Sequence, residues 1–101
     1  MVQVQVESKN KKHIDCVKVH GHAMYDDYGK DIVCSAASSI VTTTVNGILS
    51  IDKEALTYKV GKAGLTIEVL KQDKIVELLI CNMISLLKEL EKNYKDNIEV
   101  K

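Results

Sequence analysis

A histidine and a cysteine lie twelve positions apart in a segment whose composition suits a reactive site. His22 follows Gly21, and Cys34 follows a single aspartate and two apolar residues. An imidazole can take a thiol proton near neutral pH and so release a nucleophilic thiolate. If the loop between them brings these side chains together, they form a nucleophile–base pair. Whether they meet depends on the helix or strand that carries each residue.

Apolar residues at helical spacing predict a helix from about Ile32 to about Leu49. Asp31 precedes this pattern and is a good N-cap residue. Cys34 would then be the third helical residue, where unpaired backbone N–H groups favour a thiolate. Asp31 could cap the helix or orient His22 instead, and the sequence leaves both roles open.

Simpler interpretations of the same residues also remain open. A cysteine in a helix is usually a small buried hydrophobe, and a histidine at the end of a strand is usually a partly exposed, hydrogen-bonded residue. Cys16 and Cys81 lie in apolar contexts and are predicted to be core residues. A third interpretation is a zinc site made from His20, His22 and Cys34, because two histidines with i, i+2 spacing in a strand share a face.

The rest of the chain predicts one α+β domain over residues 1–101. Alternating valines predict a first strand, and paired strand patterns predict two hairpins. The predicted elements are strands at Val2–Val6, Ile14–His20, Ala55–Val60, Leu65–Leu70 and Ile98–Val100, and a second helix at Ile75–Leu90, capped by Asp73 and extended by Tyr94. The expected architecture is two-layer, with two helices packed on an antiparallel or mixed sheet in the order β-β-α-β-β-α-β.

The segment from Gly21 to Lys30 has no apolar period and is predicted to be a loop. Gly21 and Gly29 bracket it, either as hinges of a lid over a cleft or as ordinary turn residues. The chain has no Phe and no Trp, so the candidates to line an apolar cleft are aliphatic residues, Met24 and Tyr25 or Tyr28.

Composition excludes several classes of protein. Lys+Arg and Asp+Glu number 14 each, so no net field attracts nucleic acid or an anionic membrane. Three cysteines without close spacing indicate a reducing compartment rather than a disulfide framework. The first residues do not form a signal peptide, and no apolar run of membrane-spanning length is evident. We expect a soluble cytoplasmic protein with no cofactor, no nucleic-acid partner and no membrane partner.

Two motifs resemble a known family. Gly21-His22-Ala23, followed by Gly29-Lys30-Asp31-Ile32-Val33-Cys34-Ser35-Ala36-Ala37-Ser38, is similar to the motif pair of the ribosomal-processing cysteine proteases, the Prp family. The resemblance covers nearly the whole chain. The paired motifs at this separation are much more specific than a lone histidine or cysteine.

The resemblance implies a cysteine endopeptidase with a Cys–His dyad. Its implied reaction removes a short N-terminal extension from the large-subunit ribosomal protein twenty-seven, after a hydrophobic, Phe-rich motif, as ribosome assembly requires. Cys34 is implied to be the nucleophile and His22 the general base, with Asp31 and Ser38 in supporting roles. The loop that includes Ala23 and Met24 is implied to order over bound substrate, and the family is implied to be homodimeric. The alternative is a non-catalytic ribosome-associated binding module in which His22 and Cys34 are structural.

Overall fold

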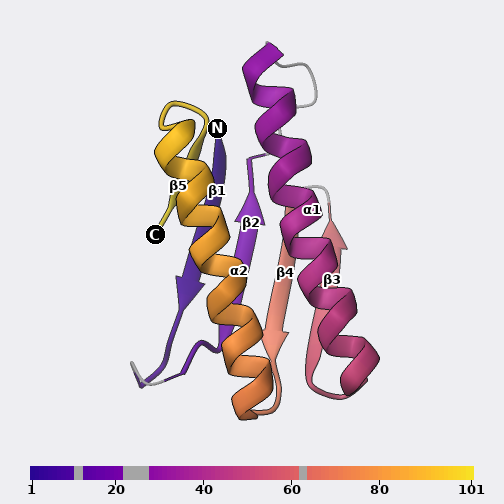
Figure 1. Cartoon of the computed structure of the whole chain (residues 1–101). Coiled ribbons are helices and arrows are strands. Elements are labelled where there is room, and N and C mark those ends of the chain that lie inside the picture. The colour runs from indigo at the N-terminus through magenta and orange to yellow at the C-terminus, as the bar shows by residue number, and fades with distance from the viewer. Residues whose placement is uncertain (11–12, 22–27, 62–63) are drawn as a thin grey trace.

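The computed structural model describes residues 1–10, 13–21, 28–61 and 64–101, and for residues 28–31 it describes the backbone alone. In chain order the elements are β1 (Val2–Glu7), β2 (Cys16–His20), α1 (Tyr28–Ile51), β3 (Leu56–Gly61), β4 (Gly64–Val69), α2 (Lys74–Asn93) and β5 (Ile98–Val100). The predicted class and element order are confirmed. Both helices lie on the same face of the sheet (Figure 1).

The five strands form one mixed sheet in the order β3-β4-β2-β1-β5. Neighbouring strands are antiparallel except β1 and β5, which are parallel. Both predicted hairpins, β1–β2 and β3–β4, are present. β2 begins at Cys16 rather than at the predicted Ile14. This topology leaves β3 and β5 as the two edges of the sheet.

The core lies between the helices and the sheet. The period of two along β1 buries Val2 and Val4 against the helices and turns Gln3 and Gln5 to the other face. The side chains of this core are aliphatic, as the sequence predicts, and Met83 is one of them. Burying each large aliphatic side chain stabilises the fold by about 1.5–3 kcal/mol. The largest fully buried residues are Val4, Val17, Val19, Val33, Val41, Val45, Ile48, Ile67, Ile80, Met83, Leu87 and Ile98.

The start of α2 follows its sequence signals closely. Asp73 has an extended backbone, and its side chain accepts a hydrogen bond from the Ile75 N–H at 2.8 Å. This confirms the predicted N-cap. Tyr94 follows the last helical residue and packs half-buried against the core. Capping and the apolar stripe together fix the length of this helix.

The start of α1 differs from the prediction. The helix begins at Tyr28 rather than Ile32, so Asp31 is its fourth residue and is not an N-cap. Gly29, for which the sequence leaves open a lid hinge or an ordinary turn residue, lies in the first turn of the helix. Hydrophobic periodicity cannot detect this turn, because a turn with a glycine and two charged residues carries no apolar period. Ala23, Met24 and Tyr25 lie outside the described residues.

The prediction about membrane-spanning length is also corrected. The stretch from Ile32 to Ile51 is long and apolar enough to cross a bilayer by length and composition. In the fold, however, one side of this helix supplies core residues such as Val33 and Val41. The opposite side exposes small polar residues such as Thr42. The stretch therefore serves as a core helix of the domain.

Candidate functional site

The first motif begins at a glycine that no other residue can replace without strain. Gly21 directly follows β2 and has φ of 87°. A Cβ on it would lie 2.1 Å from the carbonyl oxygen of Met1. A side chain is excluded by both the backbone angle and the close approach. Gly21 therefore fixes how the chain leaves β2 toward His22. His22 lies outside the described residues, so its contact with Cys34 stays a prediction.

A second glycine holds β4 against the same end of β2. Gly64 pairs with His20 and has φ of 138°. A Cβ on it would lie 2.1 Å from the Val19 carbonyl oxygen. Between two strand patterns, Gly64 would be expected to serve only in a hairpin turn. The sequence signal for this contact is the pair Gly61 and Gly64, because glycine lets two backbones approach closely.

Cys34 lies on α1, where its side chain is half-buried against the core. Ser38 follows one helical turn later and is exposed. Asp31 precedes Cys34 by three residues, and positions i, i+3 and i+7 share one face of a helix. The predicted nucleophile Cys34 and the predicted supporting residue Ser38 therefore lie on one side of α1, and the backbone of Asp31 belongs to the same helix.

The predicted activation of Cys34 by the helix start is wrong. Cys34 comes six residues after Tyr28, beyond the first turn where backbone N–H groups lack helical partners. The field of the helix terminus falls off within that turn. The predicted pairing of Cys34 with His22 does not depend on the helix start and stays a prediction.

The other two cysteines are not core residues, contrary to the prediction. Cys16 is half-buried and Cys81 is exposed. Burial raises the pKa of the Cys16 thiol, and the nearby Glu7 carboxylate raises it further. A raised pKa lowers the fraction of thiolate at neutral pH. Cys16 is therefore poorly suited to act as a nucleophile.

A hollow of about 490 Å³ opens at the end of the sheet where the two glycines lie. Its walls come from the ends of β2, β4 and β3, including His20, Gly64 and Val60. The His20 ring Nδ1 lies 3.3 Å from the Gln3 carbonyl oxygen, which can accept a hydrogen bond from an Nδ1–H. His20 is therefore held against β1 at the rim of this hollow.

The predicted zinc site cannot be assembled from the described residues. Over residues 1–10, 13–21, 28–61 and 64–101, no three His, Cys, Asp or Glu side chains cluster as metal ligands would. His20 and Cys34 belong to this part of the chain, whereas the third predicted ligand, His22, does not. The zinc interpretation stays a prediction without structural support.

Comparison with known proteins gives a consistent result. The family described as "Cysteine protease Prp" matches residues 1–99. A Bacillus subtilis protein named "Ribosomal processing cysteine protease Prp" is 27% identical to this chain, over 99% of the chain and 96% of the relative. A Staphylococcus aureus protein of the same name is 26% identical, over 99% of the chain and 97% of the relative.

Solved structures show the same fold. The structure of the S. aureus protease Prp in complex with a substrate peptide superposes with a TM-score of 0.91 at 25% identity, over 100% of this chain and 98% of that one. A second S. aureus structure, with a covalently linked product peptide, has a TM-score of 0.88. The similarity thus extends over whole chains rather than one motif.

Proposed function

Because this chain belongs to the Prp family of cysteine proteases, we propose that it removes the N-terminal extension of the large-subunit ribosomal protein twenty-seven. The observation that carries the proposal is the family match over residues 1–99. This match includes both motifs, with Cys34 and Ser38 on one stripe of α1. The chain is an enzyme, a peptidase of the cysteine class, and the alternative of a non-catalytic binding module is set aside.

Cys34 is the proposed nucleophile and His22 the proposed general base. The imidazole takes the thiol proton, and the sulfur attacks the scissile carbonyl carbon to form a tetrahedral adduct. The imidazolium then gives its proton to the leaving amine as the C–N bond breaks. Water, deprotonated by the same imidazole, hydrolyses the thioester and frees the thiol. Asp31 and Ser38 support this pair, and the reaction needs no cofactor.

Cleavage of the extended ribosomal protein tests this function. The wild-type protein should release the extension, and Cys34→Ala should not, because the alanine has no nucleophile. Cys81→Ser is the matched control: it also removes a thiol, but an exposed one on α2, so it should cleave at the wild-type rate. Cleavage by Cys34→Ala would refute the proposed mechanism.

Alkylation tests the nucleophile without a substrate. Iodoacetamide should modify Cys34 faster than Cys81, although Cys81 is the more exposed of the two. Exposure alone would give the opposite order, so a faster reaction at Cys34 reports an activated thiolate. Cys16 should react more slowly than either, because its pKa is raised. Peptide mass spectrometry at short reaction times gives the three rates, and a faster Cys81 would count against an activated Cys34.

We further propose that the protein is cytoplasmic and homodimeric. Three exposed apolar side chains of α2, those of Ile75, Leu78 and Leu86, supply surface for a second copy. No exposed charge interrupts α1 between Ile32 and Ile51, so two copies meeting there would not repel each other. Sedimentation equilibrium should give twice the chain mass, and Leu78→Glu should shift the species toward the monomer.

A further inference from the structure

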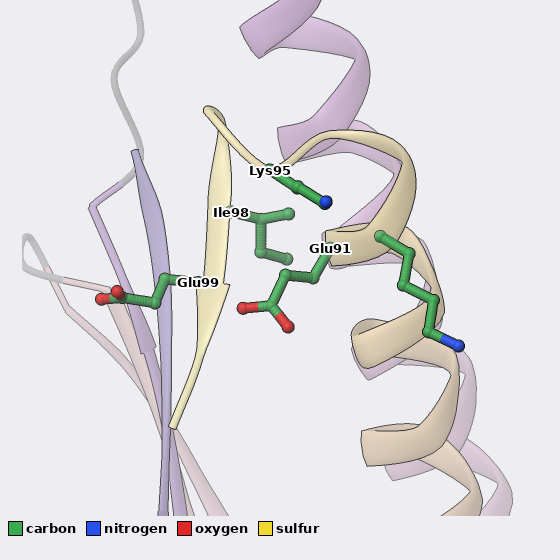
Figure 2. A pocket seen from close by; sticks show the side chains of 5 residues that line it. Glu91, Lys95, Ile98 and Glu99 are labelled. Carbon is green, nitrogen blue, oxygen red and sulfur yellow. The ribbon is translucent and has the colours of Figure 1, made fainter.

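The two edges of the sheet differ in whether their outward backbone groups are satisfied. At β5, the Ile98 N–H donates to the Tyr94 carbonyl oxygen at 3.2 Å. The Val100 N–H donates to a carboxylate oxygen of Glu91 at 2.9 Å. Figure 2 shows this glutamate reaching from α2 toward the strand, with Ile98 directed into the space between them. The β5 edge is therefore closed to a further strand.

The β3 edge is open. The Leu70 N–H donates to the Ala55 carbonyl oxygen at 2.8 Å, while the Val69 N–H turns the other way, to Asp15, at 2.9 Å. Because bonded and non-bonded pairs alternate in an antiparallel ladder, the N–H and C=O groups of Tyr58 and Val60 point away from β4. Among the described residues, no group bonds to either of these N–H groups.

Side chains along this edge suit a peptide with apolar residues at every second position. Tyr58 and Val60 share one face of β3 and are 39% and 70% exposed. Lys59 lies between them and faces the other side. Native sheets usually protect long edges with charge, bulges or covering segments. The six-residue strand β3 carries one such charge, Lys59, but exposes an apolar side chain on either side of it.

We propose that β3 is the docking strand for the polypeptide substrate, which adds to the sheet as an extended strand beside Tyr58 and Val60. This proposal rests on the proposed function. An extended peptide presents N–H and C=O groups at the spacing that the free edge requires. Its alternate side chains meet Tyr58 and Val60, which suits the apolar sequence of the proposed substrate.

The position of the edge favours substrate over a second copy. The hollow at the end of the sheet is lined by Val60 and Gly61 of β3 and also by His20 of β2. A peptide paired with β3 thus leads toward the strand end that precedes Gly21 in the first motif. A second copy paired about a two-fold axis midway between Tyr58 and Val60 would instead place Lys59 opposite its own copy, and like charges so placed are destabilising.

Backbone methylation of the peptide tests the docking strand with the protein otherwise unaltered. The probe is a fluorescein-labelled peptide containing the N-terminal extension of ribosomal protein twenty-seven, bound to full-length Cys34→Ala and followed by anisotropy. N-methylation removes one N–H at a time. It should weaken binding about fivefold or more at every second position and less than twofold between them, since one hydrogen bond contributes about 1 kcal/mol. Absent periodicity, or absent binding, overturns the proposal.

A substitution in β3 tests the same contact from the protein side. Val60→Pro removes an outward N–H without removing a ladder bond, and proline is tolerated there on an edge strand. The KM of the Val60→Pro protein for the extended ribosomal protein should rise about fivefold, and its kcat should change less than twofold. Val60→Ala keeps the N–H and shortens only the side chain, so it should raise KM less than Val60→Pro does. If Val60→Pro does not fold, the methylation scan decides.

The outcomes separate the two proposals. If the wild-type protein does not cleave the extended ribosomal protein, the proposed function fails. If it cleaves and Val60→Pro keeps the wild-type KM, only the docking strand is wrong. A Val60→Pro protein that is monomeric with an unchanged KM would assign the edge to a second copy and overturn the proposal.

Discussion

The β3 and β5 edges end the same sheet, yet they are built in opposite ways. β5 has three residues, and α2 and its C-terminal turn satisfy its outward N–H groups through Glu91 and Tyr94. β3 has six residues and leaves Tyr58 and Val60 without such cover. A free strand edge invites pairing with another chain. The difference indicates that pairing is prevented at one edge and left available at the other.

The largest expected difference between the edges is in stability. Ile98 is fully buried, so Ile98→Ala should lower the free energy of unfolding by about 2–5 kcal/mol through lost burial and a cavity. Val60→Ala at the open edge should change it by no more than about 0.5 kcal/mol. Urea unfolding of both variants checks this, and similar losses would show that β3 is as much part of the core as β5.

Removing the cover of β5 should have a smaller effect. Glu91→Ala leaves the partly buried Val100 N–H without its acceptor, so the free energy of unfolding should fall by about 1–3 kcal/mol. Glu89→Ala, at an exposed position of the same helix, is the control and should stay within about 0.5 kcal/mol of wild type. Glu91→Ala should also self-associate more in light scattering. A Glu91→Ala protein as stable as the control would mean that the carboxylate does not close the edge.

The smallest effect concerns the turn that leads into β3. A hydrogen bond from the Lys71 ammonium, supported by the Glu54 N–H, holds the pKa of Asp52 below its usual value of 3.8. A depressed folded-state pKa gives stability above the unfolded-state value, and this stability is lost as pH falls through the folded one. Wild type should therefore lose more stability below pH 3.8 than Lys71→Met. If the free energies of unfolding of wild type and Lys71→Met fall equally as the pH is lowered, the hydrogen bond from Lys71 to Asp52 does not contribute to the pH dependence of stability.

Much of the fold could be predicted because burial imposes a clear period on these residues. Val2, Val4 and Val6 alternate, and the leucines of α2 follow a capping aspartate, so both elements were identified correctly. The first turn of α1 was missed because Tyr28 and Gly29 carry no apolar period. Cys81 was placed in the core because α2 is apolar over a broad stripe, and the sequence does not say where that stripe ends.

The candidate site was harder to predict than the fold because it depends on distances between backbones. The local sequence predicts only a turn at Gly64. In the structure this glycine allows β4 to approach the backbone of Val19 closely, and no local sequence pattern predicts that contact. The open state of the β3 edge was equally hidden, because it follows from the order of the strands in the sheet, which no local pattern gives. Motif residues such as Cys34 could be named, but their neighbours required the structure.

The contact between Gly21 and Met1 has a practical consequence for recombinant work. The first carbonyl of the chain lies where a single added methyl group on Gly21 would collide with it. Any affinity tag fused before Met1 would therefore emerge beside the motif that carries His22. A tag fused after Lys101 would emerge beside β5 instead. Activity assays on this protein are best made with C-terminal fusions or with the tag removed.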